Sequence, residues 1–171
     1  MNYSAFFPEK EILHNGFFTF SIYPEGGAAT FSTLDNTTIL FVLEGTATFD
    51  FPFQKQILRE GNLMAVDKRL MNGCSCEKGT ALMEYTPSEK FIRYLDLCKN
   101  AFRKPHSSIV PILTPVKEWI DALLEVLAHG KEYPEDFWQT KRKELAFLLM
   151  DYPKDLLGEM YAALYACYKK R

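Results

Sequence analysis

Histidine, cysteine and acidic side chains could hold a metal or move a proton, but in this sequence they are few and scattered. The three histidines are His14, His106 and His129, and they lie far apart along the chain. Cys74 and Cys76 form a C-x-C pair, whereas zinc sites use pairs with wider spacing and a second pair or histidines to complete the shell. A C-x-C pair puts both thiols on one face of a strand, which predicts buried thiols. We therefore expect no metal and no cofactor.

Nucleophilic catalysis has no sequence support either. The chain contains no G-x-S-x-G turn, and "EGG" at 25–27 lacks the Lys-Ser/Thr that completes a phosphate-binding loop. No catalytic residue is predicted, and we expect a protein that is not an enzyme.

Residues 1–87 carry the pattern of a β-rich unit. Phe18, Phe20 and Ile22 alternate with polar neighbours, and the runs 39–43 and 46–51 flank Glu44-Gly45 as in a tight hairpin. Further strands are expected at 54–58, 63–66, near 70–76 and at 80–85. Short strands without helices between them predict a barrel or sandwich.

From about residue 88 the spacing of apolar residues becomes helical. A proline-rich connector extends to about 113, and helices are expected at about 114–129, 134–150 and 153–168. The predicted fold class is therefore mainly β plus α, with a β-barrel over 1–87 and a helical segment of about three helices over 88–171.

Alternation also predicts which side chains fill the barrel. If Glu44, Asp50 and Glu84 face water, their neighbours face inward. These residues could fill the barrel as core, or they could line a pocket for a small molecule, with Asn72 or Tyr85 as the polar anchor. The candidate ligand-binding residues are Phe18, Phe20, Phe41, Leu43, Phe49, Phe51, Asn72, Met83 and Tyr85.

The runs 39–45 and 60–74 resemble the two halves of the cupin signature. Gly61-Asn62 matches the start of the second half, Asp67 stands where a proline is usual, and Asn72 takes the position of the later histidine. Metal cupins are similar to one another in an upstream H-x-H pair and a glutamate, yet segment 31–38 contains no histidine. The resemblance implies a jelly-roll barrel without the usual metal. A metal-dependent enzyme acting on a sugar or small acid remains an alternative.

The segment "TKRKELAFLLMDYPKDLLGEMY" (140–161) resembles a stretch in the N-terminal regions of AraC-type transcriptional regulators, especially those of Bacteroidetes type. The matching positions are Arg142, Lys143, Glu144, Leu145, Leu148, Leu149, Tyr152, Leu157 and Tyr161. The barrel stretches "ILFVLEGTATF" and "LREGNLMAV" are also similar to that group.

This resemblance implies a sensing and dimerising part of a transcription regulator. DNA would be bound by a separate helix-turn-helix domain, expected after residue 171 and absent from this sequence. A small-molecule effector and a homodimer are the implied partners. The stripe Trp119, Leu123 and Leu127 is our candidate dimer interface, and packing within the chain is its alternative. A cupin whose only role is structural oligomerisation is a further alternative.

Charge and hydropathy agree with this interpretation. The formal net charge is -2 and the pI is about 5.9, so nothing in the bulk charge predicts direct DNA binding. No apolar run is long enough to span a bilayer, and the N-terminus lacks the basic region of a signal peptide. We therefore expect a cytoplasmic protein without a membrane partner.

Overall fold

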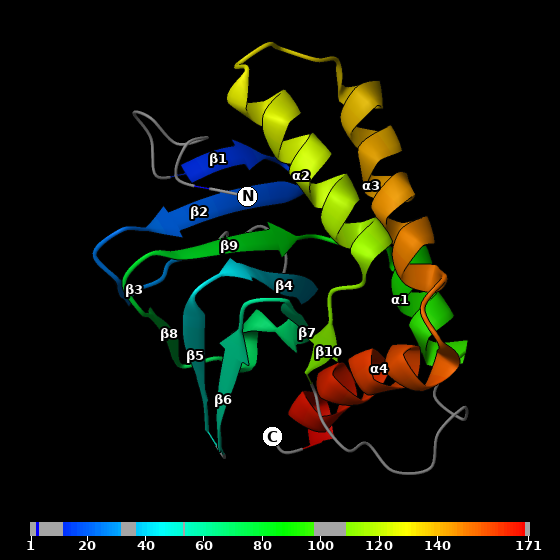
Figure 1. Ribbon diagram of the computed structural model, residues 1–171. Coiled ribbons are helices and arrows are strands. Elements are labelled where there is room, and N and C mark those ends of the chain that lie inside the picture. The colour runs from blue at the N-terminus through cyan, green and yellow to red at the C-terminus, as the bar shows by residue number, and fades with distance from the viewer. Residues whose placement is uncertain (1–2, 4–11, 32–36, 53, 98–108, 170–171) are drawn as a thin grey trace.

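Two antiparallel sheets and a layer of helices make up the structure, a computed structural model that describes Tyr3 and residues 12–31, 37–52, 54–97 and 109–169 (Figure 1). The larger sheet has six strands in the order β1 (Ile12–Asn15), β2 (Phe18–Tyr23), β9 (Thr80–Tyr85), β4 (Thr37–Glu44), β7 (Asn62–Asp67) and β10 (Val110–Pro111). The smaller sheet has four, in the order β3 (Gly27–Ala28), β8 (Gly73–Cys76), β5 (Thr46–Phe51) and β6 (Gln54–Arg59).

The helices follow the sheets along the chain. They are α1 (Glu89–Leu97), α2 (Thr114–Ala128), α3 (Glu135–Met150) and α4 (Lys154–Lys169). The last three lie within one or two residues of the expected ranges. The strand expected near 70–76 is present as the shorter β8, and the short helix η2 (Lys68–Leu70) precedes it. The predicted fold class, a cupin-like pair of sheets followed by helices, is confirmed.

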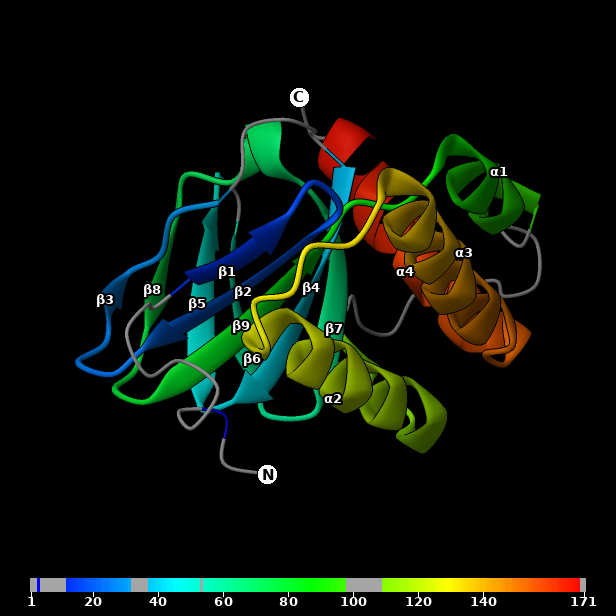
Figure 2. The ribbon, with the colours of Figure 1, turned by 90° about the horizontal axis from the view of Figure 1, so that it is seen from above.

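The helices lie on one side of the six-stranded sheet, and the four-stranded sheet lies on the other (Figure 2). Strands β4, β7 and β9 are therefore buried on both faces. Leu40, Val42 and Leu82 belong to the cluster between the two sheets, whereas Phe41 and Met83 belong to the cluster shared with the helices. Because one continuous core joins the larger sheet to the helices, the helices do not form a separate bundle.

This layering corrects the predicted barrel lining. Alternation on a strand tells which residues share a face, but not which face is the barrel interior. Six candidates lie on the opposite face, against the helices: Phe18, Phe20, Phe41, Leu43, Met83 and Tyr85. Phe49 and Phe51 do face the space between the sheets, where they pack with Leu58 and Val66.

Gly45 makes the tight turn between β4 and β5. Its φ of +81° lies in the left-handed region, and a Cβ there would meet the Thr80 hydroxyl oxygen at 2.6 Å. Only glycine meets both conditions without strain, because it has no Cβ. The turn therefore sets how β5 leaves the larger sheet and enters the smaller one.

Candidate functional site

A buried ion pair lies between the sheets, at the end of β9. The Lys68 ammonium is 2.6 Å from the Glu84 carboxylate, and the two side chains are only 9% and 5% exposed. Glu84 lies two residues after Leu82 on β9, and side chains two apart on a strand face the same side, so Glu84 points toward the smaller sheet. Burying two charges costs desolvation energy, which their attraction and hydrogen bonds must offset. A charged pair in an apolar interior is therefore a candidate functional feature.

The Asp67 side chain fixes the turn that carries Lys68. Its carboxylate is fully buried and accepts hydrogen bonds from the Arg69 backbone N–H at 3.0 Å and from the Arg69 guanidinium at 2.7 Å. Asp67 thereby caps η2 and orients the residue that follows it. The unusual aspartate at this cupin-like position thus has a structural explanation.

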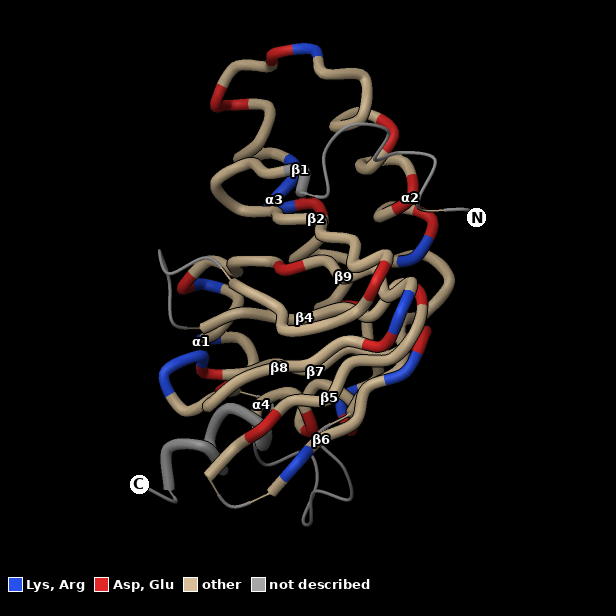
Figure 3. The backbone as a smooth tube through the Cα atoms, turned by 90° about the vertical axis from the view of Figure 1, so that its left-hand side faces the viewer, with Lys and Arg blue, Asp and Glu red and all other residues tan. Residues whose placement is uncertain are grey.

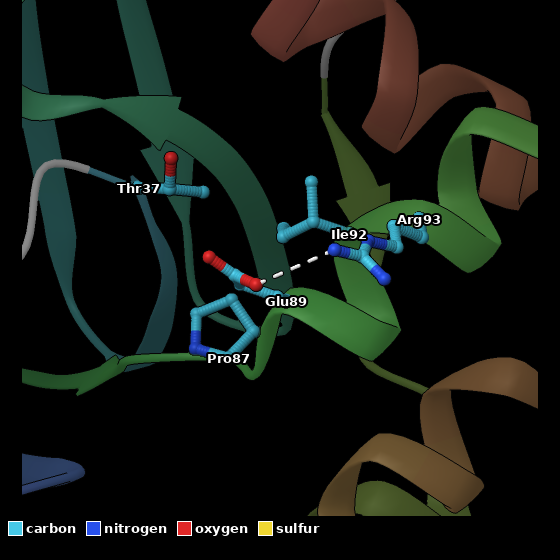
Figure 4. A pocket seen from close by; sticks show the side chains of 5 residues that line it. All are labelled: Thr37, Pro87, Glu89, Ile92 and Arg93. Atoms are coloured by element: carbon cyan, nitrogen blue, oxygen red, sulfur yellow. Dashed lines mark ion pairs between the residues drawn. The ribbon is translucent and has the colours of Figure 1, made fainter.

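A pocket of about 370 Å³, which we call the rim pocket, opens at the same end of the larger sheet. It is lined by Thr37, Pro87, Glu89, Ile92 and Arg93, which come from the start of β4, the β9–α1 connector and α1 (Figure 4). The strand register explains why it lies near the ion pair, since Thr37 is opposite Asp67.

The chemistry of the rim pocket is mixed. Arg93 and Glu89 form an exposed ion pair of 3.6 Å, Thr37 adds a hydroxyl, and Pro87 and Ile92 supply apolar surface. Exposed pairs of this kind contribute little to stability, so a ligand could replace one partner at small cost. The pocket's volume lies at the lower end of the range for small-molecule sites.

The connector beside the rim pocket is held by α3. The Arg142 guanidinium donates to the Thr86 carbonyl at 3.0 Å and to the Pro87 carbonyl at 2.8 Å. It also lies 4.3 Å from the centre of the Phe17 ring, a cation–π contact. In return, the Tyr85 hydroxyl donates to the Arg142 carbonyl at 2.8 Å. One wall of the pocket is therefore fixed to the helical layer through a single arginine.

A second fixed point ties the turn between α3 and α4 to β10 and to the residue before α2. The Tyr152 hydroxyl donates to the Pro111 carbonyl at 2.9 Å and accepts from the Leu113 backbone N–H at 2.8 Å. Leu145, Leu149 and Leu157 are fully buried beside it. The resemblance in segment 140–161 thus falls on residues that attach the helices to the sheet.

Several predicted site residues lie elsewhere than expected. Asn72 is exposed in the turn before β8, so it is not an interior anchor. Leu123 is 2% exposed within the core, which makes it inaccessible to a partner. Trp119 and Leu127 are partly buried against the same core, and the Trp119 indole N–H donates to Glu144 at 2.9 Å.

The cysteines and histidines of the described residues form no metal site. Cys74 and Cys76 are free and buried, and the thiol–thiol hydrogen bond together with burial raises the pKa of Cys74. His14 bonds to Thr19 and His129 to the Glu125 carbonyl, while His106 lies outside the described residues. Within those residues no group of three or more histidine, cysteine, aspartate or glutamate side chains could hold a metal ion.

Sequence patterns did not predict that Lys68, Glu84 and Arg142 lie at the same end of the larger sheet as the rim pocket. Its charge alone predicts a surface position for Glu84, and the resemblance in 140–161 gives Arg142 no contact partner. The available signal was the apolar run on both sides of Glu84, which is typical of a strand covered on both faces.

No protein-family model matches this chain, and no curated protein matches it. Among solved structures the fold is similar to apo ToxT K231A from Vibrio cholerae, with a TM-score of 0.52 and 10% identity over 89% of this chain and 59% of that one. Unsaturated fatty acid bound ToxT from the same species overlaps with a TM-score of 0.47 and 12% identity, over 84% of this chain and 57% of that one.

A cupin-2 domain containing protein from Shewanella frigidimarina overlaps less, with a TM-score of 0.33 and 19% identity over 44% of this chain and 74% of that one. The similarity to apo ToxT shows a shared fold, and this chain spans 59% of the length of that structure. None of the described helices is long and apolar enough to cross a membrane.

Proposed function

We propose that this chain is the effector-sensing part of a cytoplasmic AraC-type transcription regulator of the Bacteroidetes kind. It would act without catalysis, on a DNA-binding domain outside these residues. The sequence resemblance in 140–161 supports this assignment, as does the fold shared with ToxT, which is an AraC-family protein. Basic and acidic residues are interspersed along the backbone drawn in Figure 3, which differs from the clustered Lys and Arg of a DNA-binding surface.

The observation that carries the proposal is the link from the rim pocket to α3. Pro87 lines the pocket, and its carbonyl accepts a hydrogen bond from Arg142 on α3. A molecule in the pocket would contact α1 and this connector together. Any shift of the connector would change the geometry in which Arg142 holds α3.

The proposed effector is a small organic molecule with an apolar body and one polar or anionic group. Pro87 and Ile92 would contact the apolar part. Arg93 and the Thr37 hydroxyl would contact the polar group, with Arg93 released from Glu89. Such a molecule regulates only if it binds two arrangements of the helices with different affinity.

A thermal-shift screen with small carboxylic acids that carry an apolar body tests the pocket, and monosaccharides, which lack such a body, serve as the comparison set. A compound that binds only the folded state raises the melting temperature once its concentration exceeds Kd, and the rise grows with the logarithm of that concentration. Arg93→Ala is expected to abolish the shift of any active compound, and Lys90→Ala, an exposed change on the same helix outside the pocket, should preserve it. Compounds whose shift survives Arg93→Ala would bind elsewhere and contradict this site.

Regulation needs its own test. The chain would be fused to an AraC-type DNA-binding domain, and a reporter gene would be measured with and without an active compound. We expect a ligand-dependent change in expression that Arg93→Ala removes. Binding without any change in expression would overturn the regulatory role.

One observation favours a purely structural cupin as the second candidate. The cluster between the sheets is filled by apolar side chains such as Phe49, Leu58 and Leu82, which are at most 3% exposed. A structural role predicts that no compound in the screen changes the melting temperature.

A further inference from the structure

The outward face of α3 carries an exposed aromatic residue between two opposite charges. Phe147 is 66% exposed, which is unusual for a side chain of its size in the described part of this protein. Lys143 lies four residues before it and Asp151 four residues after it, and both are exposed. Residues four apart lie on one face of a helix, so the three form a single stripe.

A groove runs beside this stripe. It has a volume of about 590 Å³ and is lined by α1, α2 and α3 through Tyr94, Trp119, Glu144, Phe147, Leu148, Met150 and Asp151. The projecting ring and the apolar groove therefore share one face of the molecule. We call the stripe and the groove together the α3 patch.

The order of charges along the α3 patch limits which partner surface can pair with it. Lys143 and Asp151 are equidistant from Phe147, each about 6 Å along the helix axis. When two α3 helices pack antiparallel about a two-fold axis at Phe147, each Lys143 comes opposite the Asp151 of the other copy. Parallel packing would instead place like charges together, and a purely basic or purely acidic segment would match only half of the stripe.

The geometry points to a second copy of this chain as the partner of the α3 patch. A two-fold interface uses the same surface on both copies and must be self-complementary. The α3 patch satisfies this condition twice, because the two Phe147 rings meet at the axis, where each lines its own groove, and the charges pair on both sides. Within the described residues, neither Lys143 nor Asp151 takes part in an ion pair of its own chain.

The α3 patch would form the dimer that the AraC resemblance implies. Only the regulatory purpose of that dimer rests on the proposed function. Self-association can occur without an effector, so a failed ligand screen would leave it standing. If the dimer is absent but a compound binds at Arg93, only the present inference fails. Trp119 keeps its place at the candidate interface as a wall of the groove, whereas Leu123 does not.

Sedimentation equilibrium of the 171-residue chain gives the first test. We expect a dimer at roughly 100 µM protein, and Phe147→Glu should weaken its Kd at least about tenfold. Ile57→Glu is the matched control, since Ile57 is an exposed apolar residue on β6 and should leave the Kd unchanged. Circular dichroism of each variant checks that the fold is intact.

Charge reversal then tests the register. Lys143→Glu alone and Asp151→Lys alone should each weaken the dimer by roughly tenfold, because each makes two repulsive pairs across the two-fold axis. The double variant K143E/D151K should regain the original Kd. An equimolar mixture of the two single variants should form a heterodimer, since both of its cross-pairs are attractive.

Three results would overturn the inference. One is a monomer at every concentration. Another is a dimer that Phe147→Glu does not affect. The last is a pair of single charge variants that neither the double substitution nor mixing restores.

Discussion

Tyr85 and Arg142 hold each other in both directions, although 57 residues separate them. The Tyr85 hydroxyl donates to the Arg142 carbonyl at 2.8 Å, and the Arg142 guanidinium donates to the two carbonyls that follow Tyr85 in the chain. Glu84, the residue before Tyr85, points the other way into the ion pair with Lys68. The end of β9 therefore connects the space between the sheets, the rim pocket and α3.

Replacing Tyr85 with phenylalanine should loosen this connection. Burial raises the pKa of the Tyr85 phenol, so the hydroxyl remains a donor through the neutral range. We expect Tyr85→Phe to lower the free energy of unfolding by about 1 kcal/mol, the usual net value of one buried hydrogen bond. Urea denaturation measures the change.

Tyr94→Phe is the control for Tyr85→Phe. Tyr94 is half-buried and lines the α3 patch groove, so removal of its hydroxyl should change stability by less than about 0.5 kcal/mol. Equal losses in the two variants would mean that the bond to Arg142 does not hold α3.

Glycine substitutions separate backbone strain from steric contact. Gly45→Ala should cost at least about 2 kcal/mol, because a left-handed φ is combined with a Cβ only 2.8 Å from the Thr80 Cα. Gly61→Ala has a similar φ of +87° but open space, so it should cost about 1 kcal/mol. Gly16→Ala has neither feature and should be nearly neutral. If Gly45→Ala and Gly61→Ala were equally costly, the Thr80 contact would be irrelevant. Thermal unfolding of the three variants gives the order.

The elements of this fold could be predicted from sequence because their signals are local. Alternation over β2 and β5 and the 3.6-residue spacing over α2 depend only on neighbours in the chain. The turn at Gly45 likewise follows from short-range rules. The strands β5, β6, β7 and β9 lie close to the expected ranges for the same reason, whereas the short strands β1, β3 and β10 were not predicted.

The candidate site could not be predicted in this way, because it depends on how layers stack. Glu84 is a charged residue in a strand that is buried on both faces, and its partner Lys68 comes from a turn 16 residues earlier. Nothing local tells a solvent-facing carboxylate from one that meets a buried ammonium. The same limit applies to Arg142, whose partners are carbonyls more than fifty residues away.

Removing one partner of the buried ion pair should cost much more stability than replacing both partners with apolar residues. Lys68→Met would keep the Glu84 carboxylate buried after the loss of its cation, at a cost of about 3–5 kcal/mol. The double variant K68M/E84L should recover most of that loss, because apolar residues of similar volume can replace a buried pair. Chemical denaturation of both variants measures the difference.

Lys78→Met is the control for Lys68→Met. Lys78 and Glu25 form a 3.6 Å pair with side chains 75% and 85% exposed, so its loss should change stability by less than about 1 kcal/mol. A double variant as unstable as Lys68→Met would show that the apolar pair does not fit between the sheets.

Glu144 makes stability depend on pH at the edge of the α3 patch. Burial opposes ionisation of its carboxylate, but hydrogen bonds from Trp119 and Lys141 outweigh it and lower the pKa below its ordinary value of 4.5. A group with a lowered folded pKa stabilises the protein above its unfolded pKa, and this contribution disappears as the pH falls through the folded pKa.

Glu144→Gln should therefore be less stable than the parent at neutral pH, with the difference shrinking as the pH falls below 4.5. The side chain is 41% exposed, so solvent screening limits the difference to less than about 1 kcal/mol. Urea denaturation from neutral pH down to about pH 3 measures it. Glu118→Gln, an exposed change on α2, controls for the loss of one negative charge. A difference that stays constant over this range would mean that the bond from Trp119 does not depend on the ionised carboxylate.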